Sequence, residues 1–170
     1  RVFGEPLSPA EVARRIVADV RQRGDEAIAE YVHSLQGAKL SPDEFRIPVE
    51  ELSRARGRVS EALMTAVRRS IANVRAYQEH FLFAPPRPFQ PREGVTLGMR
   101  FRPLKRVGLC VPGGRAPYPS SVIMLAVPAQ VAGVRDICVV TPCGPDGKVS
   151  DGVLATAWEL GIKEVYRVGG

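Results

Sequence analysis

The chain has 170 residues, of which 45% are hydrophobic and 25% charged, and its formal net charge is +6. This balance is typical of a globular protein, and no apolar run reaches the roughly 18–20 residues of a membrane span. The arginines are interleaved with acids and lack clustered aromatics, so we expect neither a nucleic-acid nor a membrane partner. Three cysteines without disulfide or zinc spacing, and no signal-peptide pattern, favour a cytoplasmic location.

The beginning of the sequence predicts a pair of helices. Ser8-Pro9-Ala10-Glu11 is a capping box with proline at the first helical position, and an apolar stripe at helical spacing then runs to Gly24. Asp25 is expected to cap a second helix, which Gly37 ends. Neither helix carries a convergent set of polar residues, so we interpret the pair as a structural αα-hairpin.

A longer helix and a proline-rich segment follow. Residues 49–56 have helical composition, and residues 60–82 predict the longest helix, with an apolar stripe from Leu63 to Phe81. Residues 85–91 contain four prolines and are expected to run extended over the surface. We therefore predict a helical amino-terminal arm at 1–84, a proline-rich bridge at 85–94 and the start of an α/β domain at 95–170.

The α/β domain is predicted from alternating short apolar runs and helical segments. The expected strands are 94–102, 107–111, 136–140 and 164–168, and the expected helices run from 122 to Gly133, with Pro128 inside, and from Ser150 to Gly161. Short connections between such elements predict a parallel sheet with right-handed crossovers. The fold class is therefore α/β, a helical arm followed by a partial Rossmann-like sheet.

A glycine turn between the second of these strands and its helix is the candidate binding site. Pro112-Gly113-Gly114 interrupts the strand, and consecutive glycines let a ligand approach the main chain closely. Ser120 and Ser121 stand before the helix, and a serine-capped helix start suits an anion. The turn lacks the G-x-G-x-x-G spacing of dinucleotide sites, and a tight connection without a ligand is the alternative interpretation.

Residues 107–133 closely resemble the signature region of histidinol dehydrogenases. The shared features are Pro-Gly-Gly after a strand, a turn with Pro and Ser, the run Val-Ile-Met, a proline within the helix, and Ala-Gly at its end. Further matches are Arg23–Ala27, Thr141-Pro142 and Arg167–Gly170, so the resemblance extends from about residue 12 to residue 170.

This resemblance implies an aldehyde-dehydrogenase-like fold and a homodimer that uses NAD and zinc. The family oxidises the amino alcohol L-histidinol through an aldehyde to L-histidine, in histidine biosynthesis. Its catalytic Glu-His pair and its zinc ligands follow the Val-Gly-Gly at which this chain stops. We therefore expect no catalytic residue and no metal ligand within this chain, and no turnover by the chain alone. Because the sequence starts at Arg1 without a methionine and stops directly after a predicted strand, we interpret it as a fragment.

The resemblance also implies which residues form a wall of the NAD site. At position 110 well-studied members have a tyrosine that contacts NAD, whereas this chain has Cys110. The thiol can line the pocket of a divergent member, mark a relative that oxidises another polar alcohol, reflect lost cofactor binding, or act as a catalytic thiol. A non-catalytic remnant that serves dimerisation is a further alternative. The cofactor-binding residues expected here are Cys110, Pro112, Gly113, Gly114, Ser120 and Ser121.

Overall fold

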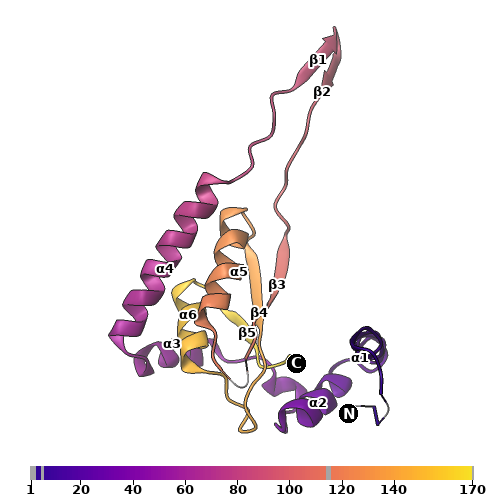
Figure 1. Ribbon diagram of the computed structural model, residues 1–170, viewed down its shortest axis with the longest axis vertical. Helices are drawn as coiled ribbons and strands as arrows, with labels where there is room; N and C mark the ends of the chain where they lie inside the picture. Colours follow the sequence, from indigo (N-terminus) through magenta and orange to yellow (C-terminus); the bar gives the residue numbers. More distant parts are fainter. Residues whose placement is uncertain (1–2, 5, 114–115, 170) are drawn as a thin grey trace.

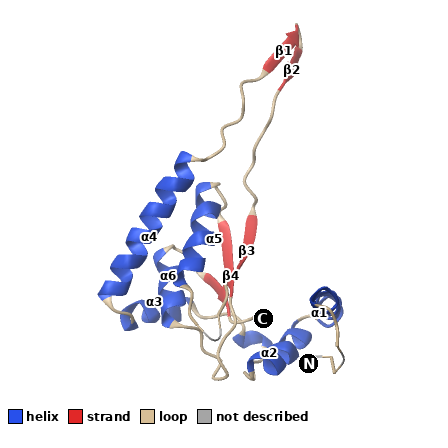
Figure 2. Ribbon diagram, in the orientation of Figure 1, coloured by secondary structure: helices blue, strands red, loops and turns tan. Residues whose placement is uncertain are grey.

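A computed structural model describes residues 3–4, 6–113 and 116–169 (Figures 1 and 2). Among these residues no helix is both long and apolar enough to cross a membrane. In chain order the elements are α1 (Pro9–Arg23), α2 (Asp25–Gln36), the 3-10 helix η1 (Pro42–Glu44), α3 (Val49–Arg58), α4 (Glu61–His80), β1 (Phe89–Arg92), β2 (Val95–Leu97), β3 (Arg106–Cys110), α5 (Pro119–Val131), β4 (Asp136–Val140), α6 (Asp151–Glu159) and β5 (Glu164–Tyr166).

The centre of the molecule is a parallel sheet in the order β3-β4-β5, which confirms the expected α/β fold class. Leu109 pairs with Val139, which pairs with Val165, and all three side chains are buried. Their face of the sheet is covered by α5 and α6, while α4 packs on α5 and α3 on α6 as an outer layer (Figure 1). On the opposite face Cys110 is exposed and Cys138 is half-buried.

The outer helices belong to the same core as the sheet. Leu52 of α3 and Met64 of α4 are fully buried in one hydrophobic cluster with residues of the strands. Ser60 caps α4 by accepting a hydrogen bond from the Leu63 N–H at 3.2 Å. The domain boundary after residue 84 stays a prediction. Helices α3 and α4, which precede this boundary, share one hydrophobic core with the α/β part of the chain.

The α1–α2 hairpin turns on a single glycine. The capping box of Ser8 and Glu11 is confirmed. Gly24, with a φ of +63°, ends α1 and is also the N-cap of α2, so the prediction that Asp25 caps the second helix is wrong by one residue. The left-handed φ of Gly24 turns the chain sharply between the two helices. Asp25 is therefore the first residue of α2, where the helix dipole stabilises its negative carboxylate.

One guanidinium holds the two helices of this hairpin together. Arg23 of α1 donates two hydrogen bonds to Asp19, both 2.6 Å, and two to Glu30 of α2, at 2.8 and 2.9 Å. The Tyr31 hydroxyl donates to Asp19 at 2.8 Å. Hydrogen bonds from Arg23 and Tyr31 lower the pKa of Asp19 from 3.8 to about 2.

The proline-rich bridge leads into a hairpin that projects far from the sheet (Figure 2). β1 pairs antiparallel with β2, so the strand expected at 94–102 is limited to 95–97 and lies outside the parallel sheet. The register shifts between Phe89 and Arg92, where Pro91 has no N–H for the ladder. Phe89, Leu97 and Phe101 are exposed along this hairpin arm.

Replacing Asp19 by Asn should lower the urea midpoint of unfolding at pH 6 and have little effect at pH 2. The pKa of Asp19 in the folded chain is about 2, below its ordinary 3.8, so its contribution is complete above about pH 4 and is lost as the pH falls toward 2. Chemical unfolding of both proteins across this range measures the difference.

Asp136→Asn is the matched control, since it removes an exposed carboxylate at the start of β4. Equal midpoint losses for the two variants at pH 6 would contradict a specific role for the Asp19 network.

Candidate functional site

The candidate site lies where the three parallel strands end. The Val111 N–H donates to the Val140 carbonyl at 2.9 Å, and the Thr141 N–H donates to the Tyr166 carbonyl at 3.0 Å. The hydrogen bonding of the parallel sheet therefore continues for one residue past the end of β3 and one residue past the end of β4. The turns at 111–113, 141–143 and 167–169 consequently gather at the carboxyl edge of the sheet, where open α/β sheets bind their ligands.

Gly113 is required here by close contact between two turns. A Cβ at this position would lie 2.9 Å from Thr141 Oγ1 and 3.0 Å from the Pro142 carbonyl oxygen. Gly169 contacts the other side of the same turn, because its Cβ would lie 3.2 Å from Pro142 Cδ. The sequence predicted that a ligand approaches the main chain at Gly113, whereas in the structure Thr141 and Pro142 fill the space that a side chain there would take. Gly114 lies outside the described residues.

Thr141 presents an unsatisfied polar atom beside this contact. Its side chain is 1% exposed, and its Oγ1 has no hydrogen-bond partner among the described residues. A buried hydroxyl without a partner is uncommon and calls for a ligand or a water molecule to complete it. In the sequence Thr141 stands out only as part of a Thr-Pro motif, because its burial depends on packing against Gly113.

The other predicted site residues lie around the same edge. Cys110 is exposed at the end of β3, opposite Val140, and Pro112 is also exposed. Ser120 is exposed and Ser121 is half-buried in the first turn of α5.

The prediction that these serines cap α5 is wrong. The helix begins at Pro119 with Tyr118 as N-cap, and no side chain accepts a capping hydrogen bond. Pro119 has its φ preset for the first helical position, so the helix starts one residue before the serines.

Gln36 joins the helical hairpin to two of the strand-end turns. Its Oε1 accepts hydrogen bonds from the Cys143 N–H at 2.8 Å and from Cys143 Sγ at 3.2 Å, and its Nε2 donates to the Gly169 carbonyl. Cys143 is buried, and burial raises the pKa of its thiol. One amide thus fixes the turns after β4 and β5 relative to α2. Gln36 was not predicted from the sequence, since its partners are distant along the chain.

A metal centre is not assembled by the described part of the chain. No three side chains of His, Cys, Asp or Glu are grouped there so that they could hold a metal ion. His33 on α2 and His80 at the end of α4 are both exposed.

Comparisons with known proteins agree on one family. The family model for histidinol dehydrogenase matches residues 7–170. The histidinol dehydrogenase of Rhodopirellula baltica is 47% identical over 170 residues, covering 100% of this chain and 37% of that protein. That of Geobacillus kaustophilus is 42% identical, covering 91% of this chain and 36% of that protein. The crystal structure of histidinol dehydrogenase from Elizabethkingia anophelis superimposes with a TM-score of 0.87 at 28% identity, over 98% of this chain and 38% of that chain. The chain thus spans well under half the length of these relatives.

Gly113→Ala should destabilise the fold by about 1–3 kcal/mol, because the new methyl group overlaps the turn at Thr141 and Pro142. Urea unfolding measures the change. Gly57→Ala is the control: a Cβ on Gly57 in α3 meets nothing within 4 Å, and alanine should stabilise that helix by up to about 1 kcal/mol. A Gly113→Ala protein as stable as the parent would contradict the tight contact.

Gln36→Leu should destabilise the chain by about 1–3 kcal/mol, since it leaves the buried Cys143 N–H without an acceptor. Gln36→Glu keeps the acceptor and loses the donor to Gly169, so its loss should be smaller. The control is Gln78→Leu, which alters a half-buried glutamine on α4. Thermal unfolding distinguishes the three variants, and equal losses for Gln36→Leu and Gln78→Leu would refute the bridging role.

Proposed function

The chain belongs to the histidinol dehydrogenase family, and from that premise we propose that it is the amino-terminal part of an NAD- and zinc-dependent enzyme that oxidises L-histidinol to L-histidine. The observation that carries the proposal is similarity that extends over nearly the whole chain, at 47% identity to a curated histidinol dehydrogenase. Since this chain spans 37% of that relative, the complete activity belongs to a longer protein in the proposal.

One feature of the carboxyl edge of the sheet supports a dinucleotide there: the buried Thr141 hydroxyl lacks a partner among the described residues. When bound, NAD accepts hydride from the alcohol carbon. In this proposal the chain binds and orients the cofactor, and Thr141 supplies a hydrogen bond. The remaining contacts are those proposed from the sequence: Cys110, Pro112, Gly113, Gly114, Ser120 and Ser121.

Cys110 is the position at which the family resemblance implies a tyrosine. The side chain is exposed at the end of β3, on the face of the sheet opposite the one that α5 and α6 cover. A thiol is smaller than a phenol and is a weaker hydrogen-bond donor, so it leaves more room beside the cofactor. This difference favours a second candidate function, in which the enzyme oxidises another polar alcohol with the same cofactor.

No metal-ligand group is assembled in the part of the chain that is described, and the family resemblance implies that the zinc ligands and the catalytic acid-base pair follow the matched region. We therefore assign both to the portion of the enzyme that follows the matched region, and expect the isolated chain to be inactive. A homodimer and a cytoplasmic location complete the proposal. The latter is supported by Cys110, Cys138 and Cys143, which are all free thiols.

Joining this chain to the remaining segment of the Rhodopirellula baltica histidinol dehydrogenase should give an enzyme that reduces NAD with L-histidinol. Its activity should be lost on chelation and restored by zinc, and the 170-residue chain alone should show none. Spectrophotometric NADH formation measures all three.

Ethanol and other simple alcohols serve as substrate controls in the same assay. Turnover by the isolated chain, or turnover that persists after chelation, would overturn the assignment of zinc and catalysis to the following segment. Turnover of another polar alcohol, with none of histidinol, would favour the second candidate.

A further inference from the structure

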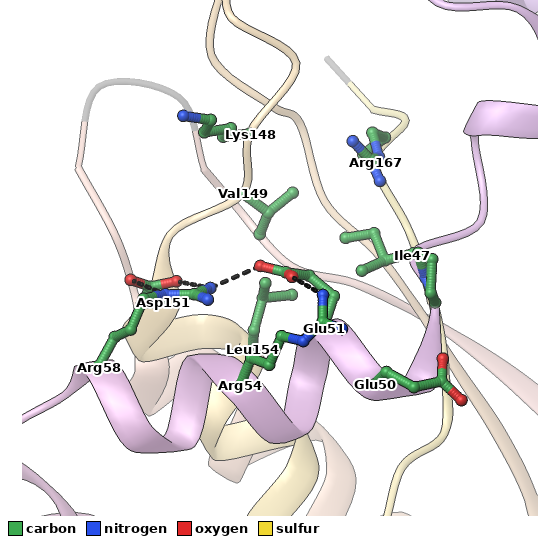
Figure 3. Close-up of a pocket in the computed structure, with 11 residues that line it drawn as sticks. Ile47, Glu50, Glu51, Arg54, Arg58, Lys148, Val149, Asp151, Leu154 and Arg167 are labelled. Carbon is green, nitrogen blue, oxygen red and sulfur yellow. Dashed lines mark hydrogen bonds and ion pairs between the residues drawn. The ribbon is translucent and has the colours of Figure 1, made fainter.

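A cleft of about 820 Å³ lies along α3 and beside the amino-terminal end of α6 (Figure 3). We call it the basic cleft. Its apolar lining comes from Ile47, Val149 and Leu154, and basic side chains from three segments surround this surface. Of the cofactor-binding residues predicted from the sequence, none that the structure describes lines it. Its lining basic residues are Arg54, Arg58, Lys148 and Arg167.

One of these cations is fully occupied by acids of the cleft. Arg58 donates to both oxygens of Asp151, at 2.9 and 2.6 Å, and to Glu51 at 2.5 Å (Figure 3). Hydrogen bonds from Arg58 lower the pKa of Asp151. The remaining lining acid, Glu50, turns its carboxylate away from this network (Figure 3). The acids thus cluster on one cation and leave the others available.

Arg54 and Lys148 have only distant acidic neighbours. Arg54 lies 4.0 Å from Glu51, and Lys148 lies 3.9 Å from Asp146, both longer than the contacts of Arg58. The two side chains are 72% and 81% exposed, so neither is held in a fixed ion pair.

Arg167 is the cation whose environment points to a ligand. Its Nε is buried without a hydrogen-bond partner among the described residues, and its Nη1 donates only to the Gly147 carbonyl, at 3.0 Å. No described carboxylate lies within 4.0 Å of it. The nearby Glu44 is already bound by the Ser41 N–H and hydroxyl. A partly buried guanidinium without an anion is unfavourable, and a bound oxyanion would satisfy it.

We propose that the basic cleft binds an organic phosphate. The phosphate oxygens accept hydrogen bonds from Arg167, whose planar fork matches them, and Arg54 and Lys148 supply further positive charge. The organic part of the ligand lies against Ile47, Val149 and Leu154. A dianion is favoured over a single carboxylate because three cations of the cleft lack a close acid.

Titration of the purified protein with inorganic phosphate and with phenyl phosphate tests the proposal, with chloride at matched ionic strength as the reference. Calorimetry should show saturable binding of both phosphates, and phenyl phosphate should bind more tightly because its ring covers the apolar lining. Arg167→Gln should weaken binding about tenfold or more, because it removes a charge-assisted hydrogen bond to the phosphate. Arg54→Gln should weaken binding severalfold.

Arg69→Gln is the matched control, because Arg69 is an exposed arginine of α4 outside the cleft. If Arg167→Gln fails to fold, Arg167→Lys, which keeps the charge but not the fork, should still weaken binding. Absence of saturable binding, or equal weakening by Arg69→Gln, overturns the proposal. The assay contains neither NAD nor histidinol, so its outcome is independent of the proposed dehydrogenase activity.

Discussion

Close contact of two glycines with the turn at Pro142 organises the carboxyl edge of the sheet. Pro142 is approached on one side by Gly113 and on the other by Gly169. Any side chain at either glycine would separate the strand ends, so the three turns are positioned as a unit. Gln36 then fixes this unit to α2 from outside the sheet. The shape of the candidate cofactor site therefore depends on packing in the α/β part and on one amide from the helical hairpin.

Elements determined by local chemistry were predicted well from the sequence. The capping box at Ser8 and the alternation that gives the parallel sheet are both confirmed. The errors arose where two local signals competed. Pro119 outweighs Ser120 and Ser121 at the start of α5, and Gly24 outweighs Asp25 at the start of α2. In both cases the helix boundary is set by the residue with the unusual backbone: proline, whose φ is restricted, at α5, and glycine, which can take a positive φ, at α2.

The site was predictable only in part, because the burial of a side chain and its hydrogen-bond partners depend on tertiary structure. Gly113 and Cys110 stand out in a motif, and the motif carries the family resemblance. Thr141 and Arg167 lie in short family matches that indicate nothing about their burial, and Gln36 lies in none. Each becomes notable only when residues distant in sequence surround it: Thr141 beside Gly113, Gln36 beside Cys143, and Arg167 beside the turn at Gly147.

The projecting hairpin has a consequence for how the polypeptide could be re-engineered. The α4 and α5 helices on either side of it are held together by the core, and the hairpin arm itself lies outside that core. Covalent continuity through residues 82–105 therefore contributes little to keeping the two halves in place. The arm is a natural position for new chain ends in a circular permutant, or for dividing the protein into two fragments that reassociate through their buried helix faces.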